Sequence, residues 1–175
     1  EDIASVIAGL DAHWGSVDVL VNNVGGGGRW GKPNIEETAA EVWDEVYQKN
    51  AAVAVAFTRW AISGMRAKKW GRVITIASIL GKEGGCRPWF TMSKAAQISM
   101  MKSLARTPYL IRDGITFNTV APGGIMIPDT GWEEERNRDP TAFDKRIDAE
   151  YALGRLGTPE EVAAVVLFLC SQQAS

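Results

Sequence analysis

The sequence is poor in the residues that build metal and disulfide sites. It contains two cysteines and one histidine among 175 residues. Cys86 and Cys170 are far apart and form neither a metal-binding nor a redox pair, so we expect reduced thiols and no metal centre. The single histidine, His13, falls at the end of a predicted helix, where we expect it to interact with the helix dipole.

Long apolar runs and an excess of charge of one sign are also missing. No stretch of about 18 apolar residues is present, and the start of the chain lacks the basic and small-residue pattern of a signal peptide. The net charge of −2, with the signs interspersed, gives no basic field for a phosphate backbone. We therefore expect a soluble, cytoplasmic protein without membrane or nucleic-acid partners.

Three short apolar runs alternate with long segments of helical periodicity. The runs are rich in β-branched residues and cover residues 17–21, 72–77 and 115–120. This order of elements is βαβ and predicts a parallel sheet. The last helix has the clearest start, because Thr158 and Glu161 have capping-box spacing and Pro159 follows the cap.

Two further helices are predicted between the strands. Thr38 and Glu41 form a capping-box signal at the start of the first. Its residues at helical spacing are Trp43, Val46, Asn50, Val53 and Phe57. Those of the second are Phe90, Lys94, Ile98, Met101 and Ala105. After the third strand, residues 125–154 are polar and interrupted by proline, which predicts a lid-like excursion with two short helices.

Small and polar residues follow all three predicted strands. They are the segment Asn22-Asn23-Val24-Gly25, then Ser78, then Ala121-Pro122-Gly123-Gly124. Ligands of open parallel sheets bind beyond the carboxyl ends of the strands, so we expect a site at this edge. Each strand end alone also fits a common turn.

Asn50 and Lys94 place polar groups in otherwise apolar helical faces. Burial of either group without a partner is costly, which predicts a polar role for both. The alternatives are a structural hydrogen bond for Asn50 and a side chain that reaches solvent for Lys94.

The glycine run at residues 25–31 formally matches a dinucleotide-binding fingerprint at Gly26, Gly28 and Gly31. That fingerprint must turn directly into a helix that holds the pyrophosphate. Here the helix is predicted only near Thr38, so we interpret the run as a flexible loop.

Taken together, the motifs resemble the short-chain dehydrogenase/reductase family over nearly the whole chain. In chain order, the motifs that carry the resemblance are Asn22-Asn23-Val24-Gly25, Asn50, Gly71-Arg72-Val73 through Ser78, Lys94 with its preceding aromatic ring, Asn118 with Val120-Ala121-Pro122-Gly123, and Arg155-Leu156-Gly157-Thr158-Pro159-Glu160-Glu161-Val162.

The resemblance implies an α/β fold with a partial Rossmann-like, doubly wound parallel sheet. Its strands are equivalent to the family's fourth to sixth, with flanking helices, and the N-terminal dinucleotide-binding βαβ unit is absent. Residues 1–175 would be a single domain, the C-terminal catalytic portion of such an enzyme, with residues 125–154 as the substrate lid. The chain would then be truncated, and it would bind a dinucleotide weakly on its own.

The resemblance also implies catalytic roles for residues of this chain. Ser78 would orient the substrate carbonyl or alcohol, and Asn50 would hold a water in a proton relay. Lys94 would bind the nicotinamide ribose and lower the pKa of a tyrosine one turn before it. In this sequence that position is Phe90, which has no proton to give.

The implied cofactor is NAD or NADP. The backbone at Asn23 and Gly25 would flank its adenosine half, while Pro122, Gly123 and Ile125 would touch the nicotinamide, and Lys94 the ribose between them.

Loss of the phenol at Phe90 removes general acid catalysis worth about 10²- to 10⁴-fold. Replacement acids are Tyr151 at the lid border, Cys86 in the loop before Phe90, or a water held by Asn50 and Ser78. Three tryptophans could line an apolar substrate pocket or simply pack, namely Trp30, Trp89 and Trp132.

Three functions remain open. The first is an NAD(P)-dependent oxidoreductase acting on a carbonyl or alcohol as a homodimer or tetramer, with an inactive Phe90 form as an alternative. The second is a non-catalytic binding or assembly module that retains the fold. The third is a product of truncation whose function belongs to a longer polypeptide. For self-association we expect a surface formed by Val53, Phe57, Ile98 and Met101.

Overall fold

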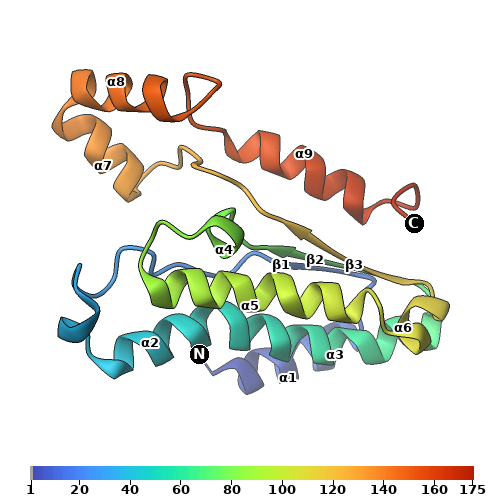
Figure 1. Ribbon diagram of the computed structural model, residues 1–175. Helices are drawn as coiled ribbons and strands as arrows, with labels where there is room; N and C mark the ends of the chain where they lie inside the picture. The colour runs from blue at the N-terminus through green and yellow to red at the C-terminus, as the bar shows by residue number, and fades with distance from the viewer. Residues whose placement is uncertain (1) are drawn as a thin grey trace.

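The computed structural model describes residues 2–175, which form a parallel sheet covered by helices. The strands are β1 (Val19–Asn22), β2 (Gly71–Ile76) and β3 (Ile115–Val120), in that order (Figure 1). The register places Val73 between Leu20 and Phe117. The partial Rossmann-like sheet predicted from the sequence is confirmed.

The helices lie on both faces of the sheet (Figure 1). One face is covered by α1 (Ile3–Trp14), α3 (Val53–Lys68) and α5 (Pro88–Leu104). The other face carries α9 (Pro159–Cys170), which contacts β2 and β3. Four shorter helices join these elements: the 3₁₀ turn η1 (Ile35–Glu37), α2 (Ala40–Tyr47), α4 (Leu80–Glu83) and α6 (Pro108–Arg112).

The main core lies between the sheet and the α3–α5 pair. Its buried members are Ala61, Met65, Val73, Met101, Leu110, Ile115 and Phe117. Met101 is 1% exposed and Ile98 is 8% exposed, so neither side chain is free to contact a second subunit. The prediction that these two residues form a surface for self-association is therefore wrong, because their helix turns them toward the sheet and its neighbouring helices.

The excursion after β3 folds into α7 (Gly131–Arg138) and α8 (Pro140–Glu150), as predicted (Figure 1). A small apolar cluster of its own holds it together, formed by Phe143, Ile147 and Leu156 with Met126, Trp132 and Tyr151 around them. The two ends of the excursion meet where Met126 donates a backbone hydrogen bond to Gly157 at 2.9 Å, and Gly157 donates one to Gly124 at 2.9 Å. We call residues 125–154 the lid.

The capping box predicted at the start of α9 is present. Thr158 Oγ1 accepts from the Glu161 amide at 3.4 Å, and the Glu161 carboxylate accepts from the Thr158 amide at 2.8 Å. The Arg155 guanidinium, together with that amide, lowers the pKa of Glu161 to about 2. These hydrogen bonds fix the point at which the lid returns to the body of the protein.

The capping box predicted at Thr38 is not formed. The N-cap of α2 is Ala39, which makes no side-chain capping bond. Thr38 Oγ1 instead accepts from the Lys32 amide at 3.0 Å and donates to the Asn34 carbonyl at 3.2 Å. The 3₁₀ turn η1 intervenes and closes on the threonine, so its hydroxyl binds the preceding loop. Within residues 2–175, no helix is long and apolar enough to cross a membrane.

Candidate active site

The segments that follow β2 and β3 are tied side by side by backbone hydrogen bonds. Ala77 donates to Val120 at 2.8 Å, and Ile79 donates to Pro122 at 3.0 Å. Ser78 therefore lies beside the turn that follows β3. Its Oγ accepts a hydrogen bond from the Leu80 amide at 3.2 Å. The strand ends thus meet at one edge of the sheet, as parallel strands must.

Asn50 lies in a π-helical turn, η2 (Gln48–Ala52), which joins α2 to α3. A π turn holds an extra residue and is frequently found at functional sites. The Asn50 side chain is fully buried. Its Nδ2 donates to the carbonyls of Val46 at 2.8 Å and Gly26 at 2.9 Å, while its Oδ1 accepts from the Gly26 amide at 3.2 Å. The amide therefore fastens the loop after β1 to the helix.

Lys94 is buried in α5 with its ammonium turned toward the strand ends. Only 6% of the residue is exposed, so the alternative of a side chain that reaches solvent is wrong. Nζ donates to the Ile76 carbonyl at 3.2 Å. Desolvation lowers the pKa of Lys94 from 10.5 to about 8, because burial disfavours the charged form.

Gly25 runs between these two polar groups. A methyl group on its Cα would lie 2.6 Å from Oδ1 of Asn50 and 3.1 Å from Nζ of Lys94. A side chain at this position would therefore collide with both groups. Among the predicted site residues, the structure brings Gly25, Asn50 and Lys94 together.

Phe90 lies one helical turn before Lys94, with its ring centre 5.6 Å from the ammonium nitrogen. The glycine loop covers this ring: a methyl group at Gly28 would lie 3.6 Å from three of its carbon atoms. Cys86 Sγ donates to the Gly28 carbonyl at 3.0 Å. The half-buried ring is therefore held between the lysine and the loop.

The glycine run forms a loop, as predicted. Gly26, Gly27 and Gly31 have positive φ angles of 148°, 86° and 73°. The next elements are η1 and α2, so no helix begins at the run itself. The hydrogen-bond donors of a helix N-terminus, which would hold a pyrophosphate, do not point into this loop.

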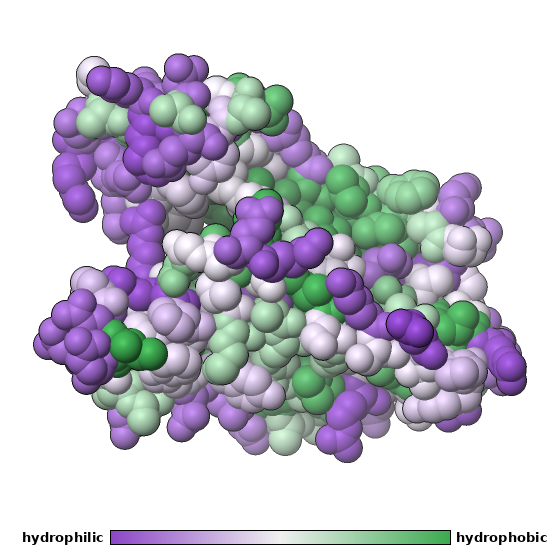
Figure 2. Space-filling view, viewed as in Figure 1, coloured by the Kyte–Doolittle hydropathy of each residue, from purple (hydrophilic) through white to green (hydrophobic). Residues whose placement is uncertain are grey.

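Asn23, Pro122 and Ile125 line a cavity of about 760 Å³ on the α9 side of the sheet. Apolar side chains of α9 form much of its wall, and Figure 2 shows such side chains gathered over this helix. A methyl group at Gly123 would meet nothing within 4 Å, so the backbone there is open to a ligand. This cavity therefore combines an apolar wall from α9 with residues of the segments that follow β1 and β3.

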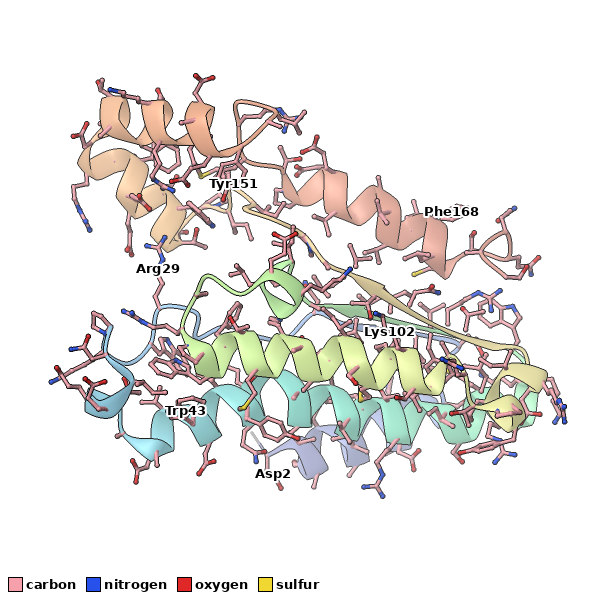
Figure 3. The ribbon with its side chains drawn as sticks, viewed as in Figure 1. Asp2, Arg29, Trp43, Lys102, Tyr151 and Phe168 are labelled. Carbon is pink, nitrogen blue, oxygen red and sulfur yellow. The ribbon has the colours of Figure 1, made fainter. Side chains whose placement is uncertain are left out.

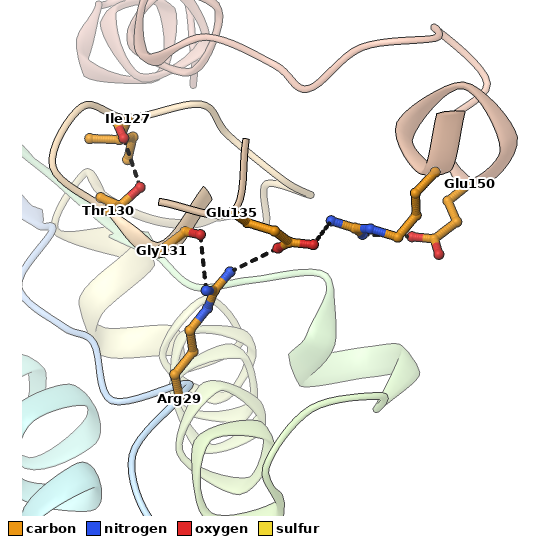
Figure 4. A network of polar contacts seen from close by, with 7 residues as sticks. Arg29, Ile127, Thr130, Gly131, Glu135 and Glu150 are labelled. Carbon is orange, nitrogen blue, oxygen red and sulfur yellow. Dashed lines mark hydrogen bonds and ion pairs between the residues drawn. The ribbon is translucent and has the colours of Figure 1, made fainter. Parts of the chain in front are cut away.

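An arginine of the glycine loop fastens the lid. Arg29 donates to the Gly131 carbonyl at 2.9 Å and lies 3.5 Å from the Glu135 carboxylate (Figure 4). Glu135 also pairs with Arg146 at 2.6 Å, and Arg146 pairs with Glu150 at 3.0 Å. Figure 3 shows Arg29 rising from its loop toward α7. The sequence offered one signal for this contact, namely a charged residue inside a glycine run.

Sequence reasoning also missed Gln97. This buried side chain in α5 donates through Nε2 to the main-chain carbonyl of Asn50 at 2.9 Å. It holds the π turn against α5. The available signal was a third polar residue, after Asn50 and Lys94, on a buried helical face.

The three tryptophans considered for a substrate pocket have different surroundings. Trp89 is fully buried and packs edge-on against Trp43 at 5.2 Å, so it is a core residue. The ring of Trp30 lies 4.6 Å from the ammonium of Lys49. Trp132 lies in the lid, edge-on to Tyr151 at 6.5 Å. Of the three, Trp132 is the one that joins the lid cluster, and the Arg29 guanidinium lies 5.7 Å from the centre of its ring.

Comparisons with known proteins show which proteins this chain resembles. A family model described as enoyl-(acyl carrier protein) reductase matches residues 1–175. The 3-oxoacyl-[acyl-carrier-protein] reductase of Vibrio cholerae is 32% identical over 177 residues, which cover 100% of this chain and 68% of the relative. The acetoacetyl-CoA reductase of Rhizobium meliloti is 35% identical over 169 residues, which cover 96% and 66%.

A solved structure shows the same likeness. The 3-oxoacyl (acyl-carrier-protein) reductase of Agrobacterium tumefaciens, with NADP bound, matches with a TM-score of 0.88 and 28% identity over 99% of this chain and 64% of that protein. The chain thus spans about two thirds of the length of the relatives that it matches.

Proposed function

Because this chain belongs to the short-chain dehydrogenase/reductase family, we propose that it forms the catalytic part of an NAD(P)-dependent reductase of carbonyl compounds. The observation that carries the proposal is the buried ammonium of Lys94 beside Gly25 and Asn50. A cation kept in the interior at a strand-end crevice is costly unless a ligand uses it. Since relatives are named for 3-oxoacyl and acetoacetyl thioesters, these are the proposed substrate class.

The cofactor, when bound, would supply the hydride for reduction. Lys94 would hold the ribose through its ammonium, and the open backbone at Gly123 would receive the nicotinamide beside Pro122 and Ile125. Asn23 and Gly25 would flank the adenosine half. Their location on one edge of the sheet supports these roles.

The substrate oxygen would be oriented by the Ser78 hydroxyl, whose hydrogen-bond partner within residues 2–175 is a backbone donor, the Leu80 amide. The hydroxyl hydrogen is therefore available to a carbonyl oxygen. Asn50 would hold the loop after β1 in place and would position any water near Lys94. Phe90 supplies a wall and no proton.

The test is reduction of acetoacetyl-CoA by NADPH or NADH, measured with the complete polypeptide that contains residues 1–175. Lys94→Met should lower kcat/KM at least about tenfold, equivalent to about 1.4 kcal/mol of transition-state stabilisation. Lys102→Met, an exposed lysine of the same helix, is the matched control and should leave kcat/KM unchanged. Equal effects of the two changes would refute the proposed role of Lys94.

A second candidate function is a non-catalytic binding or assembly module, and Phe90 is the observation that favours it. Such a module would bind a nicotinamide dinucleotide or a partner without turnover. Phe90→Tyr discriminates the two functions. A phenol beside the Lys94 ammonium is a competent acid, so in a reductase this change should raise carbonyl reduction at least about tenfold. In a module it would produce no activity.

The proposed reductase would act as a homodimer or tetramer. Exposed apolar side chains on α9 support association, since Leu167 is 75% exposed and Phe168 is 56% exposed.

A further inference from the structure

The site lacks a proton donor at Phe90, yet carbonyl reduction requires a proton on the substrate oxygen. We propose that Tyr151, at the base of the lid, supplies that proton. This inference rests on the proposed reductase function and assigns the acid that the function leaves open.

Tyr151 follows α8 (Figure 3), and its ring faces the turn after β3. Its hydroxyl lies against Gly124, where a methyl group would be 2.7 Å from Oη and 3.1 Å from the ring carbon that bears it. Gly124 adjoins Gly123 in the turn that follows β3. The phenol thus fills the space that a side chain at residue 124 would take, at the same sheet edge as Ser78.

The lid fixes this ring while leaving its hydroxyl free. Trp132 packs edge-on against the ring, and Ile147 and Leu156 belong to the same apolar cluster. The Tyr151 amide donates to the Ile147 carbonyl at 2.9 Å, which anchors the backbone. Within residues 2–175 the hydroxyl makes no hydrogen bond to protein, so its proton is available to a ligand.

The other side chains that carry a proton to donate are engaged elsewhere or lie outside the site. Cys86 directs its thiol hydrogen to the Gly28 carbonyl at 3.0 Å, beneath the glycine loop. Lys94 donates to the Ile76 carbonyl from a buried position. The remaining tyrosines, Tyr47 and Tyr109, are 40% and 57% exposed on α2 and α6, away from the lid. Tyr151 is therefore the phenol nearest the strand-end crevice.

The chemical step is balanced. The hydride that adds to the carbonyl carbon, with its two electrons, would come from NADH or NADPH, the co-reactant of the proposed function. The O–H bond of Tyr151 breaks and a new O–H bond forms on the substrate oxygen, so the carbonyl becomes an alcohol. Water then returns a proton to the phenolate.

The test is a double-mutant cycle of Tyr151→Phe and Phe90→Tyr in the complete polypeptide, with acetoacetyl-CoA and NADPH or NADH. In the Phe90 background, Tyr151→Phe should lower kcat at least about tenfold, the low end expected for loss of a general acid. In the Phe90→Tyr background, the same change should lower kcat less than about twofold, because the phenol beside Lys94 takes over.

Two controls separate chemistry from folding. Tyr151→Phe removes an oxygen that bonds to no described residue, so the midpoint of thermal unfolding should stay the same. Tyr109→Phe, on an exposed outer helix, should change neither kcat nor stability. Titration calorimetry with acetoacetyl-CoA gives a readout independent of turnover, and we expect Tyr151→Phe to weaken binding by roughly two- to tenfold through one lost hydrogen bond.

Equal losses of kcat in both backgrounds would show that Tyr151 only packs the lid, and would overturn the inference. An unmodified protein that reduces acetoacetyl-CoA at a rate unaffected by Tyr151→Phe would overturn it too, yet would leave the proposed function standing. If neither the unmodified protein nor Phe90→Tyr reduces any carbonyl, both proposals fall.

Discussion

At the residue scale, the candidate site depends on two polar side chains held inside the protein. Asn50 satisfies its amide with three hydrogen bonds to backbone groups. Within residues 2–175, the Lys94 ammonium has one acceptor, the Ile76 carbonyl. The asparagine is therefore a stable structural joint, whereas the lysine is under-satisfied and is the residue most ready to bind a ligand.

The free energy of unfolding should depend on pH because Lys94 is buried. The folded-state pKa of about 8 lies below the ordinary value of 10.5, so between these values the unfolded chain binds more protons. The free energy of unfolding should therefore rise from about pH 8 to about pH 10.5, by about 3 kcal/mol relative to Lys94→Met. Urea denaturation at several pH values measures this difference.

Lys102→Met is the control, because Lys102 is exposed on the same helix. A pH dependence that is the same for the unmodified protein and Lys94→Met would contradict the predicted desolvation.

The sequence predicted Asn50, Lys94 and the strand ends because periodicity and burial make isolated polar residues conspicuous. It could not predict that Gly28 covers the Phe90 ring or that Tyr151 lies against Gly124. Those contacts join segments distant in the chain, and no local pattern encodes them.

At the element scale, the sequence predicted a helix start correctly where the capping residues bind each other. The cap of α9 needs only Thr158 and Glu161, and it formed as predicted. The same spacing at Thr38 failed because the preceding loop competed for the hydroxyl. The π turn between α2 and α3 has no sequence signature of this kind, since the partners that hold it come from the glycine loop and from α5.

Thr158→Ala should remove the cap of α9 and destabilise the protein by about 1 kcal/mol. The Thr158 hydroxyl accepts from the Glu161 amide, which would lose this partner. Thr141→Ala is the matched control, because Thr141 is exposed near the start of α8 and makes no side-chain hydrogen bond within residues 2–175. Equal denaturation midpoints for the two variants would refute the capping role.

Arg29→Ala should loosen the lid without unfolding the protein. The arginine is largely exposed, so its contacts to Gly131 and Glu135 are worth under about 1 kcal/mol. Hydrogen exchange of α7 amides should accordingly accelerate roughly two- to fivefold. Arg138→Ala, an exposed arginine of α7 with no ion pair in the described structure, serves as control. Unchanged exchange in Arg29→Ala would show that the lid is held by its apolar cluster alone.

At the scale of the whole molecule, the sheet has two outer edges, on β1 and β3, that pair with no strand among residues 2–175. The α9 side adds an apolar surface over the cavity described above (Figure 2). Unpaired edges and apolar patches both favour association with another chain or segment.

We predict that residues 1–175 self-associate in solution, so that light scattering gives a mass above 19.0 kDa that grows with concentration. Leu167→Glu should lower this mass, because Leu167 is 75% exposed on the apolar face of α9. Leu153→Glu is the control, since Leu153 is equally exposed but lies in the lid. A concentration-independent monomer would refute the prediction.

The side chain of Asn50 makes the hydrogen bonds that a backbone peptide group would make. Its amide gives a hydrogen bond to the Gly26 carbonyl and takes one from the Gly26 amide, the exchange that two residues on neighbouring antiparallel strands make with each other. The loop after β1 is thereby joined to the π turn η2 by a pair of hydrogen bonds from a side chain. Aspartate has the same shape but no donor to offer, and leucine has neither donor nor acceptor. Of these three side chains, only the carboxamide of asparagine can both donate a hydrogen bond to Gly26 and accept one from it.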